Sequence, residues 1–289
     1  MRDVKESATR KPLPLWKQRL KTIARRFDTV YMPETGGKSE VSQDEEWCEV
    51  SVDGKRSRIR FHDYGSIYRV PGLYEEVFYQ KLKCTSPSRV VRLLEEVLKD
   101  HDIAVSDLKV LDVGAGNGIV ADELYSRQAK SLVGIDIIEE AKEAAYRDRP
   151  EVYDDYLVTD LADLNEADEK RLRKVKFNCL ATVAALGFGD IPDKAFVKAL
   201  DLVETPGWLA FNIKQDFLED RDQTGFCRLI KDLSNRGVLE IQAYRRYRHR
   251  VSMTGEPLYY VAMVARKCSD VPDELLSGET EGEAEAVVA

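Results

Sequence analysis

Long hydrophobic runs are missing from this sequence. No stretch of about 18 consecutive apolar residues occurs, so a membrane-spanning helix is excluded. The N-terminus also lacks the apolar segment and the small-residue cleavage site of a signal peptide. We therefore expect a cytoplasmic protein without a transmembrane segment.

Cysteine is scarce and irregularly spaced. The chain contains five cysteines, an odd number, and no two of them form a C-x-x-C pair. Such pairs are typical of zinc sites, and even sets are typical of disulfide frameworks. We therefore expect no metal site and no disulfide framework, and we expect most of the cysteines to be small buried side chains: Cys48, Cys84, Cys179, Cys227 and Cys268.

Charge is uneven along the 289 residues, although 43% of them are hydrophobic and can form a substantial core. Residues 1–26 carry nine basic and two acidic residues, whereas residues 270–285 carry seven acidic residues and no basic one. Because the charges of the two ends cancel, the net charge of −8 lies on the middle of the chain. This charge argues against general attraction to nucleic acid. We expect five segments: a basic amphipathic segment (1–31), a flexible linker (32–46), an N-terminal lid (47–105), a core domain (106–268) and a disordered acidic tail (269–289).

A glycine-rich turn in residues 110–120 is the most informative local pattern. An apolar strand leads into the turn, and a helix follows it. Gly114, Gly116 and Gly118 can adopt positive φ and let the backbone approach a ligand closely. A dinucleotide fingerprint requires G-x-G-x-x-G, but Ile119 stands where its third glycine belongs. The turn therefore predicts a nucleotide-type cofactor, and an oxidoreductase that uses NAD ranks low.

Two acidic residues follow at the ends of later apolar runs. Asp136 stands near the end of residues 131–138, 22 residues after the first glycine of the turn. A carboxylate there can accept hydrogen bonds from both hydroxyls of a ribose, which suits either NAD or S-adenosylmethionine. Asp160 occupies a comparable place in residues 156–161.

The motif acid-x-G-x-G-x-G, together with these two acids, resembles the class I methyltransferases that use S-adenosylmethionine. The resemblance covers about residues 108–267 and implies an α/β fold. This fold is a Rossmann-like, mostly parallel sheet of seven strands, with helices on both faces and a C-terminal antiparallel hairpin. In this family, the acid at the position of Asp136 binds the ribose hydroxyls, and the acid at the position of Asp160 binds the exocyclic amine of adenine. The implied cofactor residues are Asp112, Gly114, Ala115, Gly116, Gly118, Asp136, Ile137, Asp160, Leu161 and Tyr64.

Hydrophobic periodicity predicts alternating strands and helices along this region. Ser86 and Pro87 are typical of a helix start, with Ser86 as the cap. The expected strands are 108–113, 131–138, 156–161, 177–183, 207–213, 238–249 and 258–265, and the expected helices are 86–98, 194–203 and 222–235.

The region before the core predicts a lid. Residues 47–52 and 58–61 are expected to pair as a hairpin across Asp53 and Gly54, and residues 75–82 to form a helix. Between them lies a dense set of aromatic residues. In small-molecule methyltransferases a tyrosine-bearing segment often folds over the cofactor, which implies a role for Tyr64 at the sulfonium and for Tyr68 and Tyr74 near the substrate. Ordinary aromatic packing is the alternative.

Three features narrow the resemblance further. They are the aromatic lid, the small-residue segment 185–192 and the tyrosine-rich final hairpin. Together they are similar to the Williams-Beuren-region methyltransferase-like proteins. That similarity implies binding of S-adenosylmethionine without defining a substrate.

Two basic segments remain. Residues 13–27 place Trp16, Leu20, Ile23 and Phe27 at helical spacing among basic residues, which predicts an amphipathic helix. Such a helix docks on its own domain or contacts a membrane or an acidic partner. In residues 244–250, strand alternation puts Arg246, Arg248 and Arg250 on one face, and Arg245, Tyr247 and His249 on the other. Arg246 and Arg248 are candidates for binding an anionic substrate, unless the arginines only protect an edge strand.

The predicted function is methyl transfer from S-adenosylmethionine to a small acceptor, with an anionic acceptor as one option. Positioning does much of this work, and His62, Asp190 and His249 are candidates for accepting a proton. The segment after the expected strand 177–183 lacks the Asn/Asp-Pro-Pro-aromatic signature of methyltransferases that act on amino groups of nucleic acids and proteins. A methyltransferase acting on protein or RNA and a non-catalytic S-adenosylmethionine-binding protein remain as alternatives.

Overall fold

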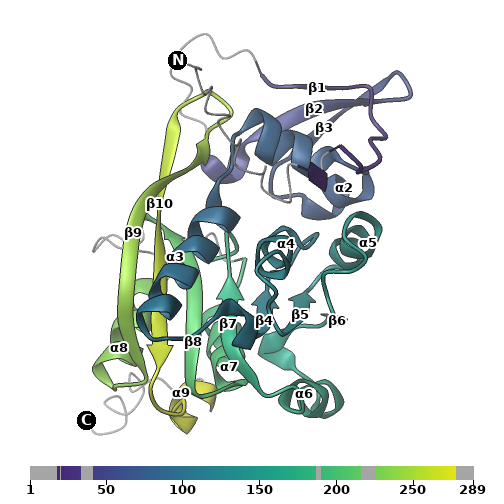
Figure 1. Ribbon diagram of the computed structural model, residues 1–289. Helices are drawn as coiled ribbons and strands as arrows, with labels where there is room; N and C mark the ends of the chain where they lie inside the picture. Colours follow the sequence, from purple (N-terminus) through teal and green to yellow (C-terminus); the bar gives the residue numbers. More distant parts are fainter. Residues whose placement is uncertain (1–17, 20, 34–41, 187–189, 216–224, 278–289) are drawn as a thin grey trace, which may run out of the picture.

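The structure, a computed structural model, describes residues 18–19, 21–33, 42–186, 190–215 and 225–277. A seven-stranded sheet runs through it in the order β6-β5-β4-β7-β8-β10-β9 (Figure 1). The strands from β6 to β8 are parallel, and β10 joins β8 and β9 in antiparallel fashion. This confirms the expected fold class. The strands are β4 (Lys109–Val113), β5 (Ser131–Asp136), β6 (Asp155–Val158), β7 (Phe177–Thr182), β8 (Val203–Lys214), β9 (Leu239–Val251) and β10 (Pro257–Lys267).

Helices cover both faces of the sheet, because the central strands are buried on both sides. Along β4, Val110 packs into the hydrophobic cluster under one set of helices, and Leu111 packs into the cluster on the opposite face. The first set is α3 (Ser86–Asp100), α4 (Ile119–Tyr125) and α5 (Glu139–Asp148). The second is α6 (Glu166–Arg173), α7 (Asp193–Asp201), α8 (Phe226–Asn235) and α9 (Asp273–Ser277). Within the described ranges no helix is long and apolar enough to cross a membrane.

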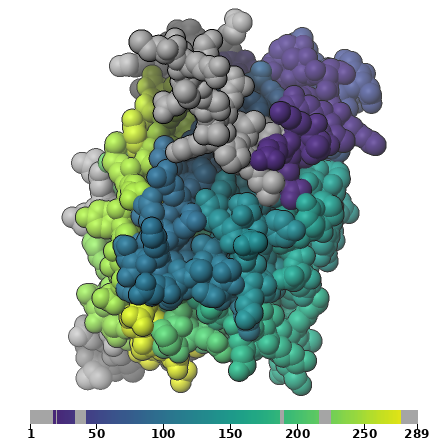
Figure 2. Space-filling model, in the orientation of Figure 1, coloured from purple at the N-terminus to yellow at the C-terminus, as the bar shows by residue number. Residues whose placement is uncertain are grey.

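A lid lies over α4 and α5 (Figures 1 and 2). Its antiparallel sheet consists of β1 (Thr29–Tyr31), β2 (Trp47–Val52) and β3 (Lys55–Arg60). Asp53 and Gly54 both have positive φ, 50° and 74°, as a two-residue primed turn requires, so the expected hairpin is confirmed. The chain continues through α2 (Tyr64–Arg69) into η2 (Glu75–Lys81), a π-helical segment where a helix was expected.

The expected helix over residues 13–27 is present at residues 18–19 and wrong from residue 21 onward. Residues 21–28 form turns and irregular backbone, and β1 follows directly. The backbone here bonds to the lid instead, since Arg26 N–H donates to Pro71 O (3.2 Å) and Asp28 N–H to Ser51 O (2.7 Å). Tertiary pairing therefore overrides the helical pattern. Trp16 and Leu20 lie outside the described residues.

Two segments expected to be flexible are partly packed. In the acidic tail, Val271 is buried, and the apolar residues of α9 pack against the core cluster next to α7. At the end of the predicted linker, Glu46 is buried and forms an ion pair with Arg250. Apolar burial and a paired charge thus fix both segments, while residues 34–41 and 278–289 lie outside the described part of the chain.

The face assignment in β9 is wrong at its end. The pairing with β10 shifts register between Leu258 and Tyr259, which oppose Arg250 and Arg248. This β-bulge breaks the alternation, so His249 and Arg250 are both buried, whereas Arg248 is exposed. Arg250 therefore does not share the face of Arg246 and Arg248.

The predicted cap of α3 is also wrong. The helix is preceded by Thr85, and Ser86 is its first residue. The Ser86 side chain is fully buried and bonds the Tyr247 hydroxyl (2.7 Å) and His249 Nδ1 (2.5 Å). The sequence motif marks the helix start correctly, but the hydroxyl serves a tertiary contact.

A glycine in β5 yields a prediction about packing. A Cβ at Gly134 would lie 2.8 Å from the Tyr156 ring and 3.0 Å from the Tyr153 ring. We expect Gly134→Ala to lower the unfolding free energy by about 1–3 kcal/mol, because both rings must move. Urea unfolding measures the loss. Gly65→Ala is the control, since a Cβ there meets the Glu140 side chain at an ordinary 3.7 Å, and equal losses in the two variants would contradict the expectation.

Candidate active site

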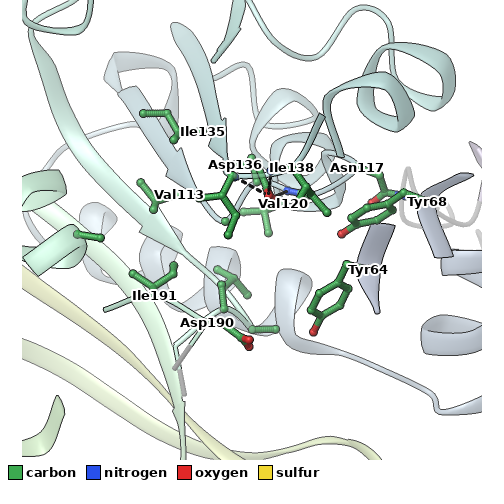
Figure 3. A pocket seen from close by; sticks show the side chains of 18 of the residues that line it. Tyr64, Tyr68, Val113, Asn117, Val120, Ile135, Asp136, Ile138, Asp190 and Ile191 are labelled. Carbon is green, nitrogen blue, oxygen red and sulfur yellow. Dashed lines mark hydrogen bonds between the residues drawn. The ribbon is translucent and has the colours of Figure 1, made fainter. Parts of the chain in front are cut away.

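A cavity of about 660 Å³ lies between the carboxyl ends of the parallel strands and the lid. In Figure 3, Val113 and Ile191 lie on one side of it and the rings of Tyr64 and Tyr68 on the other. This is where ligands bind in open α/β sheets. Twelve of the seventeen predicted site residues line it, namely His62, Tyr64, Tyr68, Tyr74, Gly114, Ala115, Gly116, Asp136, Ile137, Asp160, Leu161 and Asp190.

The glycine turn after β4 forms one wall of the cavity. Gly114, Gly116 and Gly118 have φ of 69°, 53° and 84°, a region that disfavours other residues. A Cβ at Gly114 would lie 2.6 Å from Ala185 Cβ, and one at Gly116 would clash with the Tyr68 hydroxyl. Glycine therefore meets both a conformational and a spatial requirement in this wall.

Two carboxylates line the cavity where β5 and β6 end. Asp136, which ends β5, accepts hydrogen bonds from the backbone N–H groups of Gly116 (2.9 Å), Ile137 (2.8 Å) and Ile138 (3.3 Å). Burial raises its pKa, and these hydrogen bonds oppose that shift. Asp160 follows β6 and accepts from Ala162 N–H (2.8 Å). Between them, Ile137 is 66% exposed although it lines the cavity, so an apolar surface faces the space where a ligand can cover it.

Three tyrosines of the lid close the cavity on the opposite side. The Tyr68 ring centroid lies 6.1 Å from that of Tyr64 and 5.1 Å from that of Tyr74. Burial raises the pKa of all three phenols, so they stay uncharged at neutral pH. The lid thus presents aromatic faces and neutral hydroxyls.

His62 and Asp190 stand at the lid side and the β7 side of the cavity. Burial lowers the pKa of His62, and the nearby Asp190 opposes this shift. Burial raises the pKa of Asp190, and His62 opposes it. Both groups line the cavity, so each can contact a bound molecule.

Five predicted site residues do not line the cavity. They include Gly118, the last glycine of the turn, and Asp112, which is buried in β4 and accepts a hydrogen bond from the Tyr153 hydroxyl (2.7 Å). His249 is buried, with its ring 4.1 Å from that of Tyr260. The others are Arg246, which bonds Gln215 and lies over the Tyr259 ring, and Arg248, which is exposed on β9.

The buried Asp112 gives a prediction about pH. Burial raises its pKa to about 7 from the 3.8 of an exposed aspartate. The folded protein therefore binds an extra proton between these values, and the stability contributed by protonated Asp112 is lost as the pH rises toward 7. Once the pH is above 7, the accumulated loss of unfolding free energy is about 4 kcal/mol. Asp112→Asn should melt above the wild type at pH 8 and lose most of this advantage at pH 4; a difference independent of pH would contradict the account.

A buried charge network behind the cavity was not predicted. Arg149 is fully buried and donates to Asp122 Oδ2 (2.7 Å), Glu75 Oε1 (2.9 Å) and the Asn117 carbonyl (3.0 Å). Asn117 Nδ2 donates to the same Glu75 oxygen (2.7 Å). The network joins the lid to the glycine turn. In the sequence, nothing near Arg149 indicates that it pairs with Glu75 and Asp122. Asn117 lies within the glycine turn, and its position there is the one available signal.

Asn212 was also missed. It is buried in β8 and accepts a hydrogen bond from the Ala184 N–H (2.7 Å), while its amide donates to the Tyr247 hydroxyl (2.7 Å). Ala184 has a φ of 58° and lines the cavity after β7. The bond therefore fixes an unusual backbone conformation beside the glycine turn. In the sequence, the one signal that relates Asn212 to the site is its position near the end of the predicted strand 207–213.

Comparison with known proteins relates the chain to methyltransferases. Residues 81–254 match a family described as a methyltransferase domain. A mitochondrial ubiquinone biosynthesis O-methyltransferase of Candida albicans is 27% identical over 128 residues, which make up 43% of this chain and only 38% of that protein. A solved Thermoplasma acidophilum protein is 19% identical, with a TM-score of 0.46 over 70% of this chain and 98% of the other. A magnesium protoporphyrin IX methyltransferase from Synechocystis, solved with bound S-adenosylmethionine, is 17% identical, with a TM-score of 0.44 over 63% and 79%.

The family match spans more than half of the chain. It begins at the end of η2 and includes the glycine turn, the ends of β5 and β6, and most of the wall formed after β7. The resemblance inferred from the glycine turn and the two acids is thus confirmed. The chain therefore belongs to the methyltransferase domain family.

Proposed function

We propose that this methyltransferase acts on a small molecule bound between the cofactor and the lid. The observation that carries the proposal is the position of the site beneath the lid. Aromatic residues of the lid cover a cavity of about 660 Å³, which lies within the usual size of small-molecule sites, about 300–1,000 Å³. A protein or RNA segment needs an open groove, and the lid lies across that direction.

The cavity fits the cofactor. We assign the ribose hydroxyls to Asp136, because its carboxylate lines the cavity at the end of β5. We assign adenine to the wall of Ile137 and Leu161, with Asp160 at its amine. Tyr64 then lies on the lid side, where a sulfonium would meet an aromatic face.

When bound, S-adenosylmethionine supplies a methyl group that is already activated by its positively charged sulfur. The chain's own residues then have three tasks. The glycine turn and Asp136 fix the donor, the tyrosines exclude water and orient the acceptor, and His62 or Asp190 accepts a proton from the acceptor atom. His249 takes no part in this proposal, because it does not line the cavity.

Incubation with methyl-labelled S-adenosylmethionine and a metabolite extract tests the proposal. We expect the label in small molecules after they are separated from polymers. Label in protein or RNA would favour the macromolecular alternative, and label in neither fraction, despite measured cofactor binding, would favour a non-catalytic binding protein.

A further inference from the structure

The charge of the cavity wall is one-sided. Among the described lining residues, the side chains that carry full charge are four aspartates, without a lysine or an arginine. Three of the four bond to nearby backbone N–H groups: Asp63 to Ser66 (3.2 Å), Asp136 to Gly116 and Ile137, and Asp160 to Ala162. These three have structural or cofactor-related partners. An anionic acceptor would find no cation among these side chains.

Asp190 is different. No hydrogen bond or ion pair joins it to another residue within the described ranges. Its carboxylate, at the start of the segment leading to α7, points toward the side of the cavity on which Tyr64 lies (Figure 3). It lines the cavity and is exposed to solvent, and partial burial raises its pKa. The carboxylate is therefore available to a ligand.

The neighbouring groups do not neutralise Asp190. His62 faces it, but burial lowers the pKa of His62 and favours the uncharged imidazole. Arg250 acts on His62 from behind, yet it does not line the cavity and is ion-paired with Glu46. Asp44, which also acts on His62, adds negative charge, whereas the charge of Glu46 is matched by that of Arg250. The balance at this end of the cavity is negative.

Aromatic rings complete the surroundings of the carboxylate. Tyr64 and Tyr68 stack with centroids 6.1 Å apart, and in Figure 3 their hydroxyl ends point toward the cavity. Tyrosine faces attract cations through the ring quadrupole. A carboxylate opposite tyrosine rings is the combination that recognises an ammonium group.

We propose that the methyl acceptor is a small amine, held as its ammonium ion between Asp190 and the tyrosines Tyr64 and Tyr68. The proposal rests on the proposed function and deepens it by naming the acceptor class. Before transfer, the ammonium gives one proton to Asp190, which passes it to water. The free nitrogen lone pair then forms a bond to the methyl carbon, while the carbon–sulfur bond breaks and its electron pair remains on sulfur. The products are an N-methylated ammonium ion and S-adenosylhomocysteine.

Binding of three probes of one shape tests this inference. Benzylamine, benzyl alcohol and benzoate are titrated at pH 7.5 into full-length protein saturated with S-adenosylhomocysteine, and calorimetry or ligand-observed NMR gives each affinity. We expect benzylamine to bind at least tenfold more tightly than benzoate, with benzyl alcohol between them. Asp190→Asn should reduce the preference for benzylamine about tenfold, whereas Glu166→Gln, on exposed α6, should leave it unchanged.

Any order in which benzylamine is not first, including no measurable binding of all three probes, overturns the inference. So does an unchanged preference in Asp190→Asn. Saturation with S-adenosylhomocysteine is measured first and separately. Failure of that step contradicts the cofactor site itself, whereas label transfer to a carboxylate or alcohol in the metabolite extract contradicts only the amine assignment.

Discussion

Replacing Asp136 with alanine should weaken the binding of S-adenosylhomocysteine by at least about 100-fold. Asp136 ends β5 at the cavity, where its carboxylate is placed to accept from two ribose hydroxyls. Hydrogen bonds to a charged group contribute about 1.5–3 kcal/mol each, so the loss of two exceeds about 3 kcal/mol. Calorimetric titration measures the affinity, and an unchanged affinity would contradict our placement of the ribose.

The control for this variant is Asp154→Ala. Asp154 also accepts a backbone hydrogen bond, from Leu132 N–H (2.9 Å), but at the opposite end of β5. Both alanine variants should lose comparable stability, while only the variant at position 136 should lose cofactor affinity. Asp136→Asn keeps an oxygen for the Gly116 N–H and should therefore bind more tightly than Asp136→Ala.

Replacing Arg149 with methionine should lower the unfolding free energy by about 3–5 kcal/mol. Arg149 and its partners Asp122 and Glu75 are at most 1% exposed, so removing the guanidinium leaves two carboxylates buried without this counter-charge. Arg19 continues to pair with Asp122 (2.5 Å), but within the described network Glu75 keeps only the Asn117 amide. The lid should therefore loosen from the glycine turn, and urea unfolding measures the loss.

An exposed arginine in the same protein gives the comparison. Arg173 on α6 pairs with Glu169 (2.8 Å) and Asp201 (2.5 Å), and its side chain is 46% exposed. Because solvent screens such pairs, Arg173→Met should cost less than about 1 kcal/mol. Similar losses in both variants would mean that the buried network contributes no more than a surface ion pair.

Much of the core could be predicted from the sequence, because its signals are local. Apart from Asp112, the run before Gly114 carries apolar residues on both faces, which is typical of a central parallel strand, and the structure contains it as β4. The glycines need positive φ wherever the chain turns this tightly, so the motif determines the shape of the wall. Asp136 follows from its place at the next strand end.

The rest depends on contacts between segments far apart in the chain. Ser86 has the sequence context of a cap, but its hydroxyl is used by residues of β9. A bulge decides that His249 and Arg250 are both buried, and strand alternation alone does not reveal a bulge. The pairing of Glu75 with Arg149 spans 74 positions of the chain. Such tertiary contacts leave no periodic pattern in the sequence.

A crystal structure of the protein with S-adenosylhomocysteine tests the central claim most directly. We predict the ligand in the cavity between the glycine turn and the lid, with its ribose hydroxyls within about 3 Å of the Asp136 carboxylate. Its sulfur should face the tyrosine side, with room for a small acceptor beside Asp190. Ligand density at another place, or a ribose bound without Asp136, would contradict the account.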